Sequence, residues 1–173
     1  MPATEHSIMC MGGEEDEAET FRRLICDTYP SGIVSIVSDT WDFWRVLTDI
    51  APQLKDKITG RQPDANGNAK VVFRPDSGDP VKVICGDANA SGPANKGAVE
   101  CLWDTFGGVT TETGHRLLSP SVGVIYGDSI TLDRASAILE SLERKGFASA
   151  NVVFGIGSFT YQHATRDSFG CAI

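Results

Sequence analysis

The sequence predicts an α/β domain built on a parallel sheet of about four strands that alternate with helices. Four short runs of apolar and β-branched residues carry this prediction, because their residues are apolar at consecutive positions, as in strands buried on both faces. Helical patterns separate the runs, and alternating strands and helices are typical of βαβ units. The four expected strands are residues 32–38, 70–73, 122–126 and 151–154.

Four helical patterns lie between or beside these strands. Residues 14–29 begin with acidic residues, residues 41–54 carry apolar residues at helical spacing, and residues 97–108 end at a glycine pair. Residues 131–147 give the strongest pattern, with Thr131 as the N-cap and Gly146 as the stop. Its expected inward face consists of Leu132, Ala135, Ile138, Leu139 and Leu142.

Two stretches lack any periodicity. Residues 85–97 are rich in Gly, Asn, Ala and Pro and are expected to form a surface insertion. Residues 107–120 are expected to be an irregular approach to the next strand. Residues 2–7 precede the first helix and have the character of the end of a further strand.

Composition excludes several classes of protein. The chain has 173 residues, enough for one domain with a sizeable core, or for part of a larger protein. A formal net charge of -8 argues against nucleic-acid and anionic-membrane partners, and no apolar run reaches the ~18 residues of a membrane span. The five cysteines are scattered without a CxxC pair, which favours a reducing cytoplasm over a disulfide scaffold or a zinc site.

Polar clusters follow the expected strands. Asp39 follows the first, Arg74 and Asp76 follow the second, and two glycine-rich loops beginning at Gly127 and Gly155 follow the third and fourth. The carboxyl ends of parallel strands meet at one edge, where α/β folds hold their active sites. Glycine loops that open toward helices favour phosphate, and carboxylates suit a divalent cation or ribose hydroxyls.

Each cluster also has a structural interpretation. The acids, with Asp128, would serve as helix N-caps, the glycines as tight turns, and Arg74 as an ion-pair partner of Asp76 or Asp79. His6 would be either a general acid or nucleophile or an ordinary loop histidine. Taken together, the clusters predict a site for a phosphorylated sugar with a bound cation.

Five ordered motifs add a resemblance to a known family. They are "PATEHS", "SIVSDTWDFW", "FRPDSGDP", "IYGDSIT" and "VVFGIGSFTYQHATRDSFG", and they extend over the whole chain. Together they resemble the nicotinamide phosphoribosyltransferase family in its bacterial and phage form. The resemblance implies a type II phosphoribosyltransferase, with an incomplete α/β barrel and a homodimer with sites at its interface. It also implies nicotinamide and phosphoribosyl pyrophosphate as substrates, Mg²⁺, and ATP hydrolysis coupled through a phosphohistidine.

The resemblance implies a role for each matching residue. His6 matches the phosphorylated histidine, and Asp76 matches the acid that contacts the ribose; we take these two as the catalytic residues. Asp39 matches an acid near the pyrophosphate and the metal, although the metal's ligand set stays unassigned. The remaining substrate-binding matches are Ser35 in the nicotinamide tunnel, Arg74 beside nicotinamide and ribose, Gly127, Asp128, Gly157 and Ser158 in the ribose-phosphate loops, and Arg166 at a phosphate. Ser158 departs from the animal form, which has a glycine there.

Enzymes of this family are much longer than 173 residues. Residues 1–173 are therefore expected to be a fragment of the catalytic barrel domain that is inactive alone, because the aromatic residue that stacks on nicotinamide and the acid that binds its amide lie elsewhere. Two alternatives stay open. One is a nicotinate phosphoribosyltransferase, and the other is a non-catalytic remnant that binds a phosphorylated ribose ligand.

Overall fold

The four expected strands form one parallel sheet, as predicted. The computed structural model describes residues 1–127 and 130–155. The strands lie in the order β1-β2-β5-β6, and every neighbouring pair is parallel. Their bounds are Gly32–Val37 (β1), Ala69–Arg74 (β2), Val122–Tyr126 (β5) and Val152–Phe154 (β6).

Residues 2–4 run along the outer side of β1. The amide of Thr4 donates to the Ser35 carbonyl at 3.0 Å, and the amide of Ser35 donates to the Pro2 carbonyl at 3.0 Å. Ala3 and Ser35 form a parallel bridge. The strand-like character expected for this segment is thus confirmed, and it places the following residues, including His6, beside the carboxyl end of β1.

The helices are mostly short, and several continue one another through π-helical turns. In the described ranges, none is both long and apolar enough to cross a membrane. Their bounds are His6–Met9 (α1), Glu17–Arg23 (α2) continued by Leu24–Thr28, Phe43–Arg45 (α3) continued by Val46–Ile50 and Ala51–Gln53 (α4), Lys55–Thr59 (α5), Pro80–Cys85 (α6), Pro93–Lys96 (α7), Ala98–Phe106 (α8) and Leu132–Arg144 (α9).

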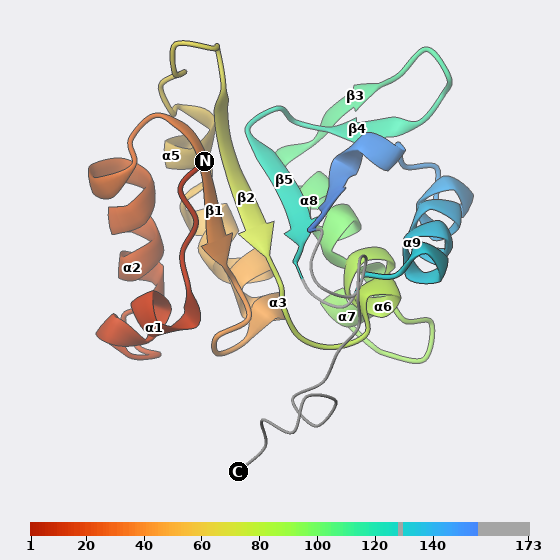
Figure 1. The fold of residues 1–173 in the computed structure, drawn as a ribbon, viewed down its shortest axis with the longest axis horizontal. Coiled ribbons are helices and arrows are strands. Elements are labelled where there is room, and N and C mark those ends of the chain that lie inside the picture. Colours follow the sequence, from red (N-terminus) through yellow and green to blue (C-terminus); the bar gives the residue numbers. More distant parts are fainter. Residues whose placement is uncertain (128–129, 156–173) are drawn as a thin grey trace, which may run out of the picture.

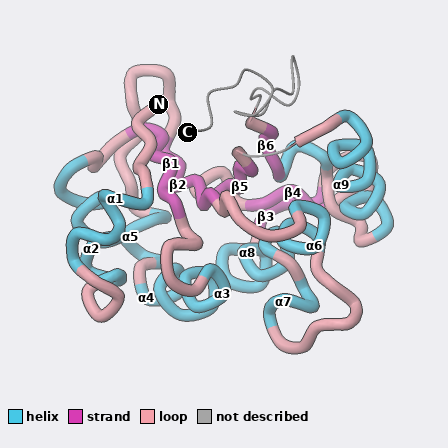
Figure 2. The backbone as a smooth tube through the Cα atoms, turned by 60° about the horizontal axis from the view of Figure 1, so that its bottom comes forward, coloured by secondary structure: helices cyan, strands magenta, loops and turns pink. Residues whose placement is uncertain are grey.

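The helices cover one face of the sheet and flank its two edges. Figure 1 shows α3 and α8 behind the strands, α6 and α7 between the lower end of β5 and α9, and α1 and α2 beside β1, with α9 on the opposite side. Figure 2, turned by 60°, shows the same layering from another direction. No described helix lies over the other face of the sheet in these views. This arrangement, a curved parallel sheet with helices outside it, is consistent with part of an α/β barrel.

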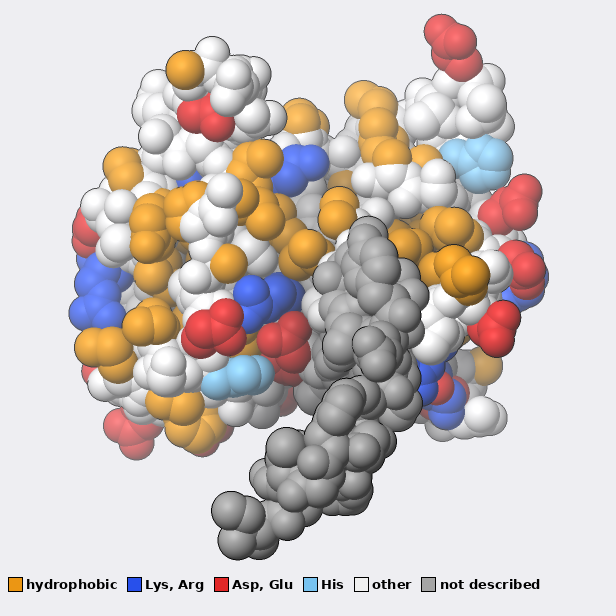
Figure 3. All heavy atoms as spheres, viewed as in Figure 1, with side chains coloured by type: hydrophobic (Ala, Val, Ile, Leu, Met, Phe, Trp, Pro, Cys, Tyr) orange, Lys and Arg blue, Asp and Glu red, His pale blue; other side chains and the backbone are white. Residues whose placement is uncertain are grey.

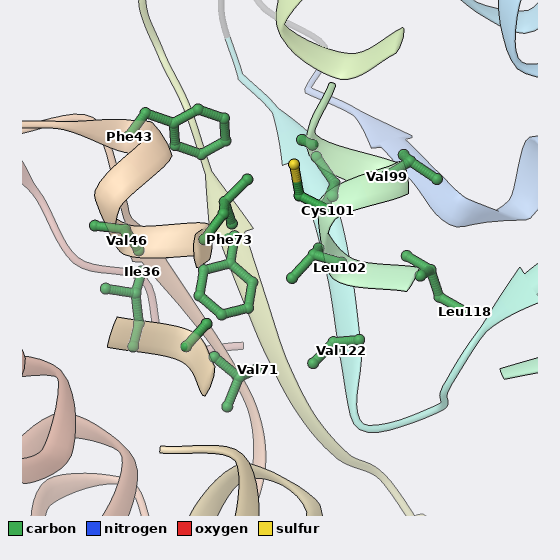
Figure 4. Packing of buried hydrophobic residues seen from close by; sticks show 14 of the residues in the cluster. Ile36, Phe43, Val46, Val71, Phe73, Val99, Cys101, Leu102, Leu118 and Val122 are labelled. Carbon is green, nitrogen blue, oxygen red and sulfur yellow. The ribbon is translucent and has the colours of Figure 1, made fainter. Parts of the chain in front are cut away.

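The hydrophobic core lies between the sheet and the helices. Val71 and Phe73 of β2 point toward the helices, where Phe43 and Val46 of the α3 region and Leu102 of α8 meet them (Figure 4). All five side chains are at most 8% exposed. Residues on the helix-facing side of these strands are therefore apolar, and the other side carries both apolar and polar residues, among them Val72, Val153 and Arg74.

Three expectations about local structure were wrong or incomplete. Leu132 and Leu139 of α9 were expected to face inward, but they are 83% and 37% exposed, because α9 contacts the rest of the domain only along the stripe that contains Ile138 and Leu142. Residues expected to be irregular form an antiparallel hairpin of Gly108–Thr110 (β3) and Arg116–Leu118 (β4). The expected insertion at 85–97 contains the short helix α7.

Candidate active site at the carboxyl edge of the sheet

The polar clusters after β1, β2 and β5 meet at one edge of the sheet, as predicted. An open cavity of about 600 Å³ lies there, lined by Glu5, His6, Arg74, Asp76, Ile125 and Gly127. On the side of the molecule drawn in Figure 3, acidic, basic and histidine side chains gather next to a band of hydrophobic ones. Residues far apart in the sequence thus form a single charged site.

Asp39 lies beside His6 and Asp76 without lining the cavity itself, and its side chain is 5% exposed. One oxygen, Oδ2, accepts hydrogen bonds from the amides of Asp76 and Ser77, both at 2.8 Å, and from the Ser77 hydroxyl at 2.6 Å. The other oxygen, Oδ1, is buried and has no hydrogen-bond partner among the described residues. Since a buried acceptor without a partner is costly, Oδ1 is the atom of Asp39 that is available to a ligand.

Arg74 connects the loop after β2 to the N-terminal segment. Its side chain is 12% exposed, and its Nη2 donates to the Thr4 carbonyl at 2.7 Å. It lies 3.5 Å from a carboxylate oxygen of Glu5 and 3.4 Å from one of Asp76. Burial raises the pKa of Asp76, and the negative charge of Asp39 adds to the rise, whereas the positive charge of Arg74 opposes it. The expected pairing of Arg74 with Asp76 is confirmed.

His6 stands above these acids, and its two ring nitrogens have different surroundings. Nδ1 lies 3.1 Å from the Thr40 hydroxyl. Nε2 lies 3.8 Å from Asp39 Oδ1 and 3.9 Å from Asp76 Oδ2. Two carboxylates near Nε2 favour the neutral tautomer that has its proton on Nε2 and its lone pair on Nδ1.

The two site acids do not cap helices, contrary to the structural interpretation of Asp39 and Asp76. Asp42 caps α3, accepting from the amides of Trp44 and Arg45, and Asp79 caps α6 in the same way. Because other acids supply the caps, Asp39 and Asp76 have no such role in local structure.

Other predicted residues are placed differently. Ser35 is fully buried in β1, its hydroxyl has no hydrogen-bond partner among the described residues, and it does not line the cavity. Gly127 lines the cavity, and a Cβ atom on it would lie 3.1 Å from Asp76 Oδ1, so a side chain there would crowd that acid. The predictions for Asp128, Gly157, Ser158 and Arg166 lie outside the described residues.

Sequence reasoning missed four contributors to the site. Thr4 and Glu5 contact Arg74, Thr40 contacts His6, and Ser77 contacts Asp39. Each of these contacts joins residues more than 30 positions apart in the chain, and the sequence indicates Glu5 only as a neighbour of His6. The sequence signal for Thr40 and Ser77 was their position directly after Asp39 and Asp76.

The described residues contain no group of three or more His, Cys, Asp or Glu side chains that could hold a metal ion. The site can instead contribute one or two carboxylates to a cation whose other ligands come from a bound phosphate and water, as Mg²⁺ sites often do. Fixed carboxylates, an arginine and an imidazole around one cavity can stabilise a sugar cation and accept a phosphoryl group.

Comparison with known proteins identifies relatives over the whole chain. A model described as the nicotinate phosphoribosyltransferase (NAPRTase) family matches residues 1–173. Proteins named nicotinamide phosphoribosyltransferase are 66% identical over 175 residues in Acinetobacter baylyi and 42% identical over 171 residues in Mycoplasma pneumoniae. A third, from Xanthomonas campestris, is 34% identical over 170 residues. These alignments cover 100%, 97% and 97% of this chain, but only 35%, 36% and 32% of the relatives, so the chain spans about a third of their length.

Proposed function

The chain belongs to the nicotinate phosphoribosyltransferase family, and on this premise we propose that it is part of a nicotinamide phosphoribosyltransferase. The reaction joins nicotinamide to phosphoribosyl pyrophosphate and gives nicotinamide mononucleotide and pyrophosphate, a step of NAD biosynthesis. The observation that carries this proposal is the cavity at the sheet edge, where Arg74, Asp76 and His6 meet. The name shared by the relatives supports the amide as the substrate.

Asp76 and Arg74 act at the ribose in this proposal. As pyrophosphate leaves, positive charge develops on ribose C1 and negative charge on the leaving group. A fixed carboxylate next to the sugar stabilises the first charge, and such preorganised groups usually supply the largest part of a rate enhancement. Arg74 holds Asp76 in place through its 3.4 Å contact. Gly127 leaves room for a substrate beside that carboxylate.

His6 takes the phosphoryl group of ATP in this proposal. The Nδ1 lone pair attacks the γ-phosphorus, the bond from that phosphorus to the bridging oxygen breaks, and ADP leaves with the electron pair. Nε2 keeps its proton, and the resulting positive charge on the ring faces Asp39 and Asp76 at 3.8 and 3.9 Å. The two carboxylates thus stabilise the phosphorylated ring.

One atom of the site suits Mg²⁺. Asp39 Oδ1 is a buried carboxylate oxygen without a hydrogen-bond partner among the described residues. Asp39 Oδ1 would hold the ion together with phosphate oxygens of the substrate, and Asp76 Oδ2 would then be the carboxylate oxygen that stabilises the charged His6 ring. When bound, Mg²⁺ supplies positive charge that stabilises the leaving pyrophosphate.

We also infer a homodimer in the reducing cytoplasm. Support for the dimer comes from the family resemblance and from the helix-free sheet face, where Val153 is 58% exposed. Cys10, Cys26, Cys85 and Cys101 are free thiols, which agrees with a reducing compartment. The net charge of -8 disfavours nucleic acid as a partner.

A chimera tests the proposal. Residues 1–173 would replace the matching 35% of the Acinetobacter baylyi relative, and the product would be assayed with phosphoribosyl pyrophosphate, Mg²⁺ and ATP. Formation of nicotinamide mononucleotide at a rate within about tenfold of the relative's is the expected result. A folded chimera that binds phosphoribosyl pyrophosphate without turnover would instead support the non-catalytic remnant.

Nicotinate is the second candidate substrate, because the matching family is described by that activity. Parallel assays with labelled nicotinamide and nicotinate separate the two. A ratio of kcat/KM values that shifts toward nicotinate in the chimera, compared with the relative alone, would contradict the proposal. The relative alone serves as the control, since two thirds of the chimera comes from it.

A further inference from the structure

The Thr40 hydroxyl has one interaction in the described structure, and that interaction is with His6. The two atoms, Thr40 Oγ1 and His6 Nδ1, are 3.1 Å apart, although 34 positions separate the residues in the sequence. Threonine just before a helix usually acts as its cap, but here Asp42 caps α3. The position of the Thr40 hydroxyl therefore has no explanation in the local structure of its own segment.

The rest of the site leaves the His6 ring poorly restrained. The His6 side chain is 48% exposed, and its other nitrogen lies 3.8 and 3.9 Å from the carboxylates, which is beyond hydrogen-bond distance. These charges favour a proton on Nε2, but they do not fix the plane of the ring. The contact of Nδ1 with the Thr40 hydroxyl at 3.1 Å does, because in the tautomer with the proton on Nε2 a donor at Nδ1 requires the ring to turn its lone pair toward the hydroxyl.

From this geometry we propose that Thr40 is a positioning residue for His6. Its hydroxyl donates to Nδ1 and holds the ring in the orientation in which Nδ1 carries the lone pair and Nε2 faces Asp39 and Asp76. This inference rests on the proposed function of His6 as the acceptor of a phosphoryl group. When the lone pair forms the bond to phosphorus, the Thr40 hydroxyl loses its acceptor and donates instead to an oxygen of the transferred phosphoryl group.

Two substitutions isolate the hydroxyl. Thr40→Val keeps the branched shape and removes the donor, whereas Thr40→Ser keeps the donor. Thr48→Val is the matched control, since the Thr48 hydroxyl donates to the Trp44 carbonyl within a helix and does not touch the site. Thermal melts of all three variants show whether each one folds as the parent does.

The first measurement needs no enzymatic activity. In the chimera with ¹⁵N-labelled histidine, the His6 signals are identified by their loss in His6→Gln. The parent should show a hydrogen-bonded, unprotonated Nδ1 and a protonated Nε2. Thr40→Val should shift the Nδ1 resonance and increase ring motion, and Thr40→Ser should restore both. Unchanged Nδ1 resonance and ring motion in Thr40→Val would overturn the proposal.

The second measurement uses the chimera and separates positioning from folding. Thr40→Val should lower the rate of His6 phosphorylation by ATP about tenfold, the effect of one lost hydrogen bond to a reacting group. The ATP-independent rate of nicotinamide mononucleotide formation should fall less than the phosphorylation rate, and Thr40→Ser should recover the phosphorylation rate. Equal loss of both rates would indicate a structural role and would overturn the proposal. If the parent chimera is not phosphorylated, the proposed function of His6 fails, and the NMR result alone decides the role of Thr40.

Discussion

Two arginines at opposite ends of the β1–β2 pair are both largely buried, yet their partners differ in kind. Arg61, 7% exposed, lies at the amino end and donates to three backbone carbonyls, those of Ile25, Ser31 and Gly32. Arg74 lies at the carboxyl end, where it donates to one carbonyl and faces the carboxylates of Glu5 and Asp76. The carbonyls bind Nη1 and Nη2 of Arg61 within the protein, and its Nε is buried without a partner among the described residues, whereas carboxylates around Arg74 form a polar cavity.

The difference indicates that buried charge at the amino end of the sheet contributes to stability, whereas buried charge at the carboxyl end contributes to the site. Burial lowers the pKa of Arg61, and no carboxylate among the described residues lies within ion-pair distance of it. Arg61 follows α5, and its hydrogen bonds connect this part of the chain to the helical turn that continues α2 and to the start of β1. The charges around Arg74 do not connect helices in this way. Substitutions at the two ends should therefore affect different properties.

The largest effect is expected for Arg61→Met, which removes a charged donor from three buried carbonyls. The free energy of unfolding of the 173-residue chain should fall by about 3 kcal/mol or more in urea denaturation. The kcat/KM of the folded chimera should stay within about twofold. Arg22→Met is the matched control, because its ion pairs with Glu19 and Asp27 are at the surface and should contribute less than about 1 kcal/mol. A lower kcat/KM of Arg61→Met with an unchanged free energy of unfolding would contradict the structural role of Arg61.

Asp76→Asn should have the opposite profile. Replacing the carboxylate with an amide of the same shape should lower kcat/KM of the chimera by about two orders of magnitude, as when a transition-state contact is lost. The melting temperature should change by no more than a few degrees, because Asp76 contributes little core packing. Asp79→Asn provides the control, since asparagine is also a good N-cap. Activity within a few-fold of the parent would show that Asp76 has no role at the ribose.

Glu17 extends the comparison to a buried acid outside the site. Its carboxylate is fully buried without a hydrogen-bond partner among the described residues, 3.7 Å from Arg45. Burial raises the pKa of Glu17 to about 7, with Arg45 opposing the rise and Glu14 and Asp42 adding to it. Because the pKa of Glu17 is higher in the folded than in the unfolded state, protonation of Glu17 stabilises the fold at low pH. This stabilisation is lost as pH rises through about 7.

Glu17→Gln should therefore increase the free energy of unfolding by about 1–2 kcal/mol at pH 8 and leave it nearly unchanged at pH 5. Urea denaturation at the two pH values measures this. The same substitution at exposed Glu14 should show no such difference between the two pH values. A constant effect at both pH values would mean that Glu17 is charged throughout.

The smallest effect is expected for Asp79→Ala, which removes the cap of α6. Its side chain accepts from the amides of Val81 and Lys82, so the loss should cost about 1 kcal/mol of stability in thermal denaturation. Activity should change by less than about twofold. A large fall in kcat/KM would show that the capping acid also serves the site.

The four parallel strands could be predicted because their residues are apolar on both faces, a property that needs no knowledge of the fold. The hairpin could not, since all three residues of β3 are exposed and carry no apolar pattern. Leu132 and Leu139 were misassigned because periodicity predicts a helix but does not predict how much of its apolar face packs against the rest of the domain. Helix α6 spans six residues and starts at Pro80, which is too short for its pattern to be recognised.

In the site, Asp39, Arg74 and Asp76 could be predicted from their positions directly after strands. The roles of Thr40 and Ser77 could not, because each depends on a contact between loops 34 or more positions apart. Ser35 was assigned through the family resemblance alone, and its buried hydroxyl without a partner among the described residues leaves that role as a prediction.

At the ends of both β1 and β2, the site acid precedes the capping acid by three residues, as in Asp39 with Asp42 and Asp76 with Asp79. Mutation can therefore change one acid of each pair while the other keeps the next helix in place. Asp39 also accepts three hydrogen bonds from the loop after β2, so the two roles are separated most cleanly at Asp76, whose variants should keep the fold while their chemistry changes. Such a division of labour makes this edge of the sheet a place where new substrate preferences can evolve without first losing the fold.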